Sequence, residues 1–378
     1  MMKFKTISIF LIILSLTSGF LIGYYLRLQK LVPELSDVSV DIYALVNNVS
    51  NDIVVIRELY FRERPNVIII NSSVVVGTWG SKVPEDVLML EKIFKKTLLV
   101  PESYNISESY SGLLGMWIAA SVGNSIYVVS DNIRVGDPLV YRVLAHELMH
   151  VLQYQHFIIP MPKTFDETLA IRSFIEGDAD VVSDSYVAGK GLRGISKVTD
   201  ITFGDPFIDL QLLPYVFGSK FVEELYGKGG WGRVNEAYSS PPKSMKHIMF
   251  PEKYLSNETI HYIVNNVSCN VIYEDVLGPS YIYVMIGKYF NKSYALVLSE
   301  SWLGDKATYC SGVDGDVLYW RIKWDSTNSA MRFYDSYMTI INMYGGHRVG
   351  DRFFVDGLII NVSQDLDEVV IESFRSGY

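Results

Sequence analysis

The sequence is poor in cysteine and in clustered positive charge, and each shortage argues against a class of protein. Its 378 residues include only 2 cysteines, too few for a disulfide-rich scaffold. Cys269 and Cys310 fit either one disulfide or two buried thiols, and we favour the disulfide because both fall in the C-terminal part of the chain. The formal net charge of -9, without a stripe of Lys and Arg, argues against a nucleic-acid partner.

Apolar residues, in contrast, are abundant. Hydrophobic residues make up 49% of the chain and aromatic residues 13%, which excludes a disordered protein and supplies apolar surface for more than one core. A length of 378 residues favours two globular units. We therefore expect a globular chain with two folded parts and no nucleic-acid-binding surface.

The beginning of the chain differs in kind from the rest. Residues 6–26 carry no charge; two lysines precede them, and Arg27 and Lys30 follow. About 21 residues of this kind can cross a hydrocarbon core at ~1.5 Å per residue. We expect residues 1–30 to form a signal anchor that spans a membrane; the alternative is a signal peptide removed near residues 17–19. The flanking charges nearly match, so they do not set the orientation.

Acceptor tripeptides for N-glycosylation are the second sign of an extracytoplasmic protein. The chain contains seven, where about two are expected by chance, at Asn48, Asn71, Asn105, Asn257, Asn266, Asn291 and Asn361. We expect a body outside the cytoplasm that carries N-glycans, either anchored in the membrane or secreted after signal cleavage. The alternative is a composition rich in Asn and Ser with no sugar attached.

The part before the central helices reads as a mixture of helices and strands. Helical spacing covers residues 37–60 and 84–99, whereas residues 66–76 are β-branched enough for a strand. A hairpin turns at Gly123-Asn124, and its second strand, residues 125–130, is a candidate edge for an extended peptide.

Two capped helices follow the hairpin. Asp137 can cap a helix that has Pro138 at its first position and ends near His156, its polar end. A capping box, Thr164 to Glu167, begins a second helix that runs to Gly189. Three prolines then make residues 239–254 a rigid loop.

The C-terminal part, from residue 256, predicts a small α+β domain. Its expected strands are residues 280–286, 307–310, 317–324, 352–355 and 369–374, with a helix over 327–341. We find no chemistry in this part, and a packing or substrate-selecting role is our only expectation for it.

The first of the two capped helices carries the main chemical motif. His146 and His150 are four residues apart and therefore point their imidazoles at one spot on the same helix face, which is ligand spacing for zinc. Glu147 can remove a proton from water in the open coordination position. Glu176 on the following helix is our candidate third ligand, and Asp180, one turn later, can accept the free N–H of a liganding histidine. We expect Asp178 and Asp184 to be solvated.

These residues resemble the gluzincin branch of zincin metallopeptidases, whose third ligand is the Glu of a Glu-x-x-x-Asp pattern on the next helix. The chain also resembles a little-characterised group of gluzincin-like membrane-anchored or secreted peptidases. The resemblance extends to four further segments: residues 214–218 (PYVFG), 241–254 (the Pro-Pro loop), 302–305 (WLGD) and 324–326 (WDS). One departure stands out, because such relatives often have His where this chain has Phe250; its own histidine is His247.

The resemblance implies a fold and a mechanism. The fold is α+β: a zincin-like domain over residues 31–255, with a sheet and an active-site helix, and a smaller C-terminal α+β domain over 256–378. The mechanism is zinc-dependent hydrolysis of a peptide bond, with Glu147 as general base on zinc-bound water. The oxyanion would need a donor, for which Tyr215, Tyr238 and His247 are the candidates.

Two other classes of function compete with a membrane-anchored peptidase whose catalytic domain lies outside the membrane. An intramembrane protease is disfavoured, because Arg142, Gln153 and Gln155 lie on the motif helix and the long apolar run is N-terminal. A cell-surface binding or assembly protein with a structural or latent zinc site stays open, since a motif supplies ligands but not an accessible cleft.

Overall fold

The computed structural model describes residues 41–79, 83–113, 118–134, 136–195, 197–311 and 315–375. The expected membrane anchor of residues 1–30 lies outside them. Within the described ranges, no helix combines the length and the apolar character that crossing a membrane requires. The mixture of helices and sheets in these ranges is α+β, as the sequence predicts.

A small sheet forms the first layer of the N-terminal part. Its strand order is β1 (Asn66–Ile70), β3 (Ser125–Val129), β2 (Ala119–Val122), with β1 parallel and β2 antiparallel to β3. Val122 pairs with Ser125 across the predicted two-residue turn, where Gly123 adopts a φ of 57°. Our expected edge strand is wrong, because β3 lies in the middle and β2 is at the edge.

The segment after β1 also differs from its prediction. The strand ends at Ile70, and α3 (Ser72–Trp79) follows where we expected the strand to continue to residue 76. The helix begins where Asp131 accepts hydrogen bonds from the backbone and hydroxyl of Ser72. This contact joins residues 59 positions apart and therefore leaves no local signal in the sequence.

Four long helices form a second layer, in which α6 packs against this sheet and the others pack against α6 or against one another. They are α2 (Ile42–Arg57), α6 (Pro138–His156), α7 (Phe165–Gly189) and α8 (Pro206–Ser239). The caps of α6 and α7 are those predicted: Asp137 accepts from Leu139 N, and Thr164 accepts from Glu167 N. Helix α6 contacts the sheet and α7, and α7 in turn packs along α8.

Shorter helices connect the two halves of the molecule. Helices α4 (Glu85–Lys96) and α5 (Ile106–Leu113) precede the hairpin, and η2 (Ser130–Asn132) follows it. The segment that we expected to be a rigid loop contains two one-turn helices, α9 (Met245–Met249) and α10 (Pro251–Leu255). The predicted domain boundary falls at the end of α10 and stays a prediction.

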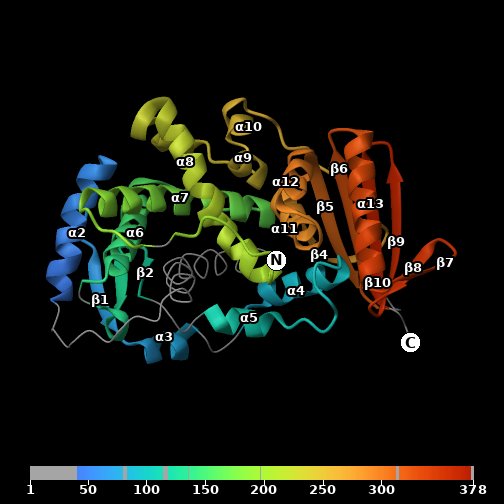
Figure 1. The fold of residues 1–378 in the computed structure, drawn as a ribbon, viewed down its shortest axis with the longest axis horizontal. Helices are drawn as coiled ribbons and strands as arrows, with labels where there is room; N and C mark the ends of the chain where they lie inside the picture. The colour runs from blue at the N-terminus through green and yellow to red at the C-terminus, as the bar shows by residue number, and fades with distance from the viewer. Residues whose placement is uncertain are drawn as a thin grey trace.

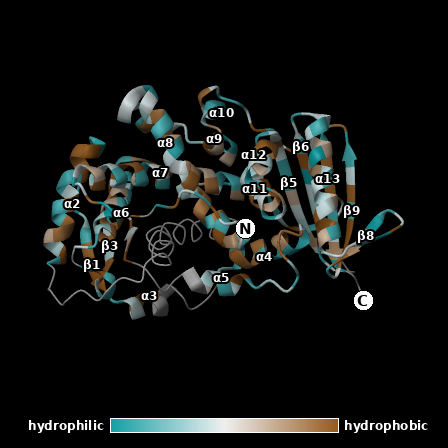
Figure 2. Ribbon diagram, viewed as in Figure 1, coloured by the Kyte–Doolittle hydropathy of each residue, from teal (hydrophilic) through white to brown (hydrophobic). Residues whose placement is uncertain are grey.

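A large antiparallel sheet dominates the C-terminal part of the described chain. Its strand order is β4 (Asn270–Asp275), β5 (Trp302–Ser311), β6 (Val317–Trp324), β10 (Glu368–Arg375), β9 (Leu358–Asp365), β8 (Arg352–Val355), β7 (His347–Val349). Helix α13 (Thr327–Met343) packs on β6, β9 and β10 through an apolar face; its hydrophilic and hydrophobic positions alternate along the ribbon in Figure 2.

One predicted strand in this part is a helix. Residues 280–286 belong to α11 (Gly278–Tyr289), which is buried through Gly287 and is followed by α12 (Lys292–Glu300). A fully buried helix has no polar face, so its aromatic and β-branched run is indistinguishable from a buried strand by periodicity. Figure 1 shows α11 and α12 between the long helices and the large sheet.

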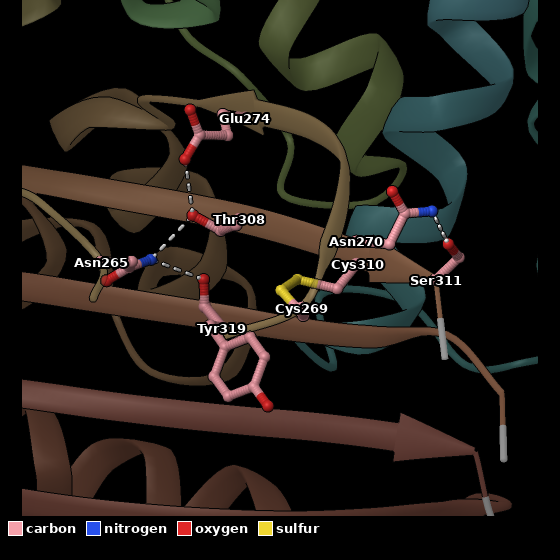
Figure 3. Close-up of a disulfide and its surroundings, with 8 residues drawn as sticks. All are labelled: Asn265, Cys269, Asn270, Glu274, Thr308, Cys310, Ser311 and Tyr319. Carbon is pink, nitrogen blue, oxygen red and sulfur yellow. Dashed lines mark hydrogen bonds between the residues drawn. A yellow bond between two sulfur atoms is a disulfide. The ribbon is translucent and has the colours of Figure 1, made fainter. Parts of the chain in front are cut away.

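Cys269 and Cys310 form a disulfide, the alternative that we favoured. Cys269 directly precedes β4, Cys310 lies on β5, and their Cα atoms are 6.0 Å apart. Figure 3 shows the bond between the two strands, with Asn270 donating to Ser311 beside it. The bond therefore fastens edge strand β4 to its neighbour.

Buried carboxylates fix the backbone at the start of α7, α9 and α11. Asp275, at the end of β4, accepts from Phe165 N at 2.7 Å, while Asp166 accepts from Met245 N at 2.9 Å. Asp305 on β5 accepts from the backbone of Leu277 and Gly278 at the start of α11. The helix that carries Glu176 is thus fixed at its beginning by the C-terminal part of the molecule.

Candidate metal centre

Helices α6 and α7 bring the three predicted ligands together. His146 Nε2 lies 3.1 Å from Glu176 Oε2 and 3.0 Å from His150 Nε2, and His150 Nε2 lies 3.5 Å from Glu176 Oε2. The side chains of His146 and Glu176 are 0% and 2% exposed, and that of His150 is 10% exposed. The three groups form a compact cluster that could hold a metal ion.

Contacts on the outer side of each imidazole fix which nitrogen faces the cluster. His146 Nδ1 lies 3.0 Å from Asp180 Oδ1, and His150 Nδ1 lies 2.7 Å from Gln153 Oε1. Both partners are acceptors, so each Nδ1 carries the hydrogen when the rings are neutral. Both Nε2 atoms then present lone pairs to each other and to the Glu176 carboxylate.

This arrangement fits zinc. Zinc binds imidazole nitrogen and carboxylate oxygen at about 2.0 to 2.2 Å, so two ligand atoms on a tetrahedron lie about 3.3 to 3.6 Å apart. The observed separations of 3.0, 3.1 and 3.5 Å lie in or slightly below that range. Three lone pairs that converge at such distances repel one another unless a cation or a proton lies between them.

The electrostatics of the cluster favour a positive charge at this point. Burial alone lowers the pKa of His146, but the hydrogen bonds and charges of Asp180 and Glu176 outweigh it and raise the pKa to about 10. Burial alone raises the pKa of Glu176, yet the charges and hydrogen bonds of the two histidines outweigh it and bring this pKa below the usual range. A metal ion and a proton therefore compete for one site.

Glu147 faces the small sheet, beside the cluster. Its side chain is fully buried; Oε2 accepts from Ser121 Oγ on β2 at 2.8 Å, and Oε1 has no hydrogen-bond partner among the described residues. Burial is the main cause of its raised pKa, which the two histidines and Ser121 partly offset. A carboxylate with one free oxygen and a raised pKa is suited to accept a proton. No motif or spacing in the sequence indicated Ser121.

Asp180 holds His146 as predicted, but it also has partners that the sequence did not indicate. Its Oδ1 accepts from Arg142 Nη2 at 2.9 Å, and its Oδ2 accepts from Ser219 Oγ at 3.3 Å. Arg142 Nε donates in turn to Asp184 at 2.8 Å. We expected Asp184 to be solvated; instead it is partly buried and paired. We also expected Asp178 to be solvated, and this was wrong, because Asp178 is fully buried and paired with Arg57.

The three candidate oxyanion donors lie in different surroundings. The ring of Tyr215 is 6.3 Å from that of His146, and its buried hydroxyl has no hydrogen-bond partner among the described residues. Tyr238 already donates to Asp178 at 2.6 Å, and His247 on α9 contacts the carbonyl of Glu258 at 2.9 Å. Only Tyr215 combines proximity to the ligands with an unused donor.

A buried cation that the sequence analysis missed lies beside the third ligand. Arg172 Nε is 3.8 Å from Glu176 Oε1, and Arg172 Nη1 donates to Gln211 at 2.6 Å. Nε and Nη2 have no hydrogen-bond partner among the described residues. Arg172 is one helical turn before Glu176, a spacing that a helical reading of the sequence could have singled out.

The other segments of the resemblance have structural roles. Gly218 ends the 214–218 segment where α8 touches α7, and Asp305 accepts from the indoles of Trp302 and Trp320 as well as from α11. Ser326 caps α13 by accepting from Ser329 N. His146, His150 and Glu176 make none of these contacts, although Tyr215 of the 214–218 segment lies beside His146.

Comparison with known proteins adds little to this site. A family described as a domain of unknown function (DUF8575) matches residues 269–373, which hold the large sheet. A solved structure from Chloroflexus aurantiacus, described as "a putative hydrolase with a novel fold", is 16% identical, covers 64% of this chain and 97% of its own, and has a TM-score of 0.39. No curated protein matches the chain. Neither match includes a statement about metal binding in this chain.

Proposed function

We propose that the chain is a zinc-dependent peptide hydrolase of the gluzincin type that acts outside the cytoplasm. The observation that carries the proposal is the converging set of two imidazole nitrogens and one carboxylate, with both tautomers fixed from outside. The buried carboxylate of Glu147 beside this set adds the base that hydrolysis needs. Zinc is the metal that this donor set favours, since it accepts nitrogen and oxygen ligands and leaves one position open for substrate.

Each residue of the cluster has a separate task in this proposal. When bound to His146, His150 and Glu176, zinc supplies Lewis acidity, which polarises a carbonyl and makes water more acidic. Glu147 Oε1, which has no hydrogen-bond partner in the described part of the chain, takes the proton of the attacking water and delivers it to the leaving amine. Ser121 holds the other oxygen of that carboxylate. The hydroxyl of Tyr215, which donates to no described residue, is our choice for the donor that stabilises the oxyanion.

The place of action rests on the N-terminal segment and on the acceptor asparagines. Six of the seven acceptors are exposed, as glycosylation requires: Asn48, Asn71, Asn105, Asn257, Asn266 and Asn291. Asn361 lies on β9, is only partly exposed and donates to Glu372 at 3.0 Å. We propose N-glycans at the six exposed positions, and a membrane anchor in residues 1–30, with secretion after signal cleavage as its alternative.

The test combines metal analysis with peptide hydrolysis. The chain from residue 31 onward is expressed as wild type, Glu147→Gln and His150→Ala, and the zinc content and the cleavage of a broad peptide library are measured. We expect about one zinc per chain and cleavage in the wild type, zinc without cleavage in Glu147→Gln, and loss of both in His150→Ala. Absence of zinc in the wild type would refute the ligand assignment.

The burial of the cluster favours a second candidate, a binding or assembly protein with a zinc site that is structural or latent. His146 and Glu147 are both 0% exposed, so substrate access requires a rearrangement of the surroundings. Under this alternative the wild type would contain zinc and unfold at lower temperature after chelation, but it would cleave no peptide, and Glu147→Gln would behave like the wild type in every assay.

A further inference from the structure

Gln153 makes a set of contacts that neither the motif nor the proposed catalytic steps require. It lies on α6, three residues after His150, and is 1% exposed. Its Oε1 lies 2.7 Å from His150 Nδ1, and its Nε2 donates to the carbonyl oxygen of Ile175 at 2.8 Å. Ile175 directly precedes the third ligand on α7. One amide group thus contacts the second ligand and the backbone beside the third ligand.

The carbonyl of Ile175 determines which way the amide points. A carbonyl oxygen only accepts, so the amide nitrogen must face Ile175 and the amide oxygen must face His150. The reverse orientation would place the amide oxygen of Gln153 against the carbonyl oxygen of Ile175. It would also place the amide N–H₂ group against His150 Nδ1, which would then have to accept a hydrogen bond. The amide therefore places the ring hydrogen of His150 on Nδ1 and leaves Nε2 for the cluster.

A buried ion pair lies behind the same amide. Asp178 Oδ2 is 3.5 Å from Gln153 Nε2. Arg57, from the end of α2, holds Asp178 through two hydrogen bonds of 2.9 and 3.2 Å, and both side chains are 0% exposed. Tyr238 donates to Asp178 at 2.6 Å, and Arg57 donates to Asn235 at 2.7 Å. Helices α2, α7 and α8 all contribute to this group.

We propose that Gln153 is the positioning residue of His150 and that the Arg57–Asp178 pair holds Gln153 in place. The two ligand histidines are then supported differently: His146 by the carboxylate of Asp180, His150 by a neutral amide. Outer partners of this kind fix ring orientation and commonly change metal affinity by ~10- to 100-fold. The importance of the contact for metal binding rests on the proposed function, whereas the tautomer itself does not.

The test measures the tautomer and the metal affinity separately. Long-range ¹H–¹⁵N correlation on the ion-free chain, with its 6 histidines labelled, reports which nitrogen of His150 carries hydrogen. Zn²⁺ affinity by chelator competition and the Co²⁺ absorption spectrum are compared among wild type, Gln153→Met and Gln155→Met. Gln155 is the matched control: it lies on the same helix but binds the backbone of residues 62 and 63 and the side chain of Asn124.

We expect hydrogen on His150 Nδ1 in the wild type. In Gln153→Met, the Zn²⁺ affinity should fall by roughly 10- to 100-fold and the Co²⁺ spectrum should change, whereas in Gln155→Met the affinity should stay within about twofold of the wild type. An affinity in Gln153→Met equal to that of Gln155→Met would overturn the inference while the proposed function stood. A wild type that binds neither metal would instead refute the proposed function. Should Gln153→Met fail to fold, a wild-type His150 ring with hydrogen on Nε2 and none on Nδ1 would still refute the inference.

Discussion

The side chain of Ser121 decides how the carboxylate of Glu147 is presented. It donates from the edge strand β2 to Oε2 at 2.8 Å, and both groups are buried. A donor to a carboxylate stabilises its charged form and therefore lowers its pKa, which is the direction of the Ser121 contribution. The same hydrogen bond leaves Oε1 as the oxygen that is free to accept a proton.

We predict that Ser121→Ala lowers the rate of peptide hydrolysis without removing zinc. A hydrogen bond to a charged group contributes about 1.5 kcal/mol or more, so kcat should fall about tenfold. Loss of the donor removes a hydrogen bond that stabilises the ionised carboxylate and should therefore raise the pKa of Glu147. Since the base acts when ionised, the acid limb of the kcat/KM profile should move to higher pH. Zinc content and pH-dependent kinetics check both parts.

The neighbouring hydroxyl of Ser125 supplies the control for this prediction. Ser125 lies on the same hairpin, but its Oγ accepts from Asn66 at the far side of the sheet. Ser125→Ala should keep the rate and the pH profile of the wild type. If Ser121→Ala left the acid limb unmoved while the rate fell, the serine would act on packing and not on the base.

Single residues of the site divide into those with a local signal and those without one. His146, His150, Glu176 and Asp180 follow from helical spacing, because residues four apart share one face. The contacts of Ser121 and Gln153 depend on which strand and which helix pack against α6, and no spacing rule contains that information. Asp178 appeared solvent-facing for the same reason, since its partner Arg57 is 121 residues away.

At the scale of elements, the position of Glu176 depends on a backbone contact between helices α7 and α8. A Cβ atom added to Gly218 would lie 2.0 Å from Ser173 O, and one added to Gly177 would lie 2.2 Å from Gly218 C. Real side-chain atoms do not approach so closely, so two glycines allow the helices to touch. Gly177 follows Glu176 directly, and the contact therefore sets the position of the third ligand.

We predict that Gly218→Ala destabilises the chain by about 3 kcal/mol, the upper end of the usual cost of overpacking, and weakens zinc binding, because the helices must separate to admit the methyl group. Gly227→Ala, on the same helix with nothing within 4 Å, should be stabilising by about 0.5 to 1 kcal/mol, since alanine is the better helix former. Urea unfolding with zinc titration measures both. Equal stabilities for the two variants would contradict the proposed contact.

The elements that were predicted well are those with local end signals. Helices α6 and α7 carry their caps in the sequence, at Asp137 and Thr164, and they begin and end where expected. Helix α11 was mistaken for a strand because it is buried on all sides. The strand β4 was not predicted, since four of its six residues are exposed and its pairing with β5 is set by the rest of the sheet and by the disulfide.

At the scale of the whole molecule, Asp275 joins the C-terminal sheet to the start of α7, and two further buried carboxylates interact electrostatically with it or with each other. Asp166, Asp275 and Asp305 are all buried, and burial is the main cause of the raised pKa of each. Their mutual repulsion adds to the shift of Asp166 and of Asp275. Hydrogen bonds from backbone N–H groups partly offset the raised pKa values. For Asp275 one of these donors is Phe165 N at the start of α7, so the joint between the two parts depends on pH.

Asp275 permits a test, because its pKa is raised from 3.8 to about 6. The folded state then holds a proton that the unfolded state releases, so this stabilisation is complete below about pH 4 and is lost as pH rises through 6. We predict that the free energy of unfolding of the wild type falls by about 1.4 kcal/mol more than that of Asp275→Asn between pH 5 and pH 8. Asparagine preserves the acceptor for Phe165 N but cannot ionise.

Asp335→Asn, at an exposed carboxylate on α13, should follow the wild type. Parallel pH dependences for Asp275→Asn and the wild type in urea unfolding would show that Asp275 keeps an ordinary pKa and that the joint is insensitive to it.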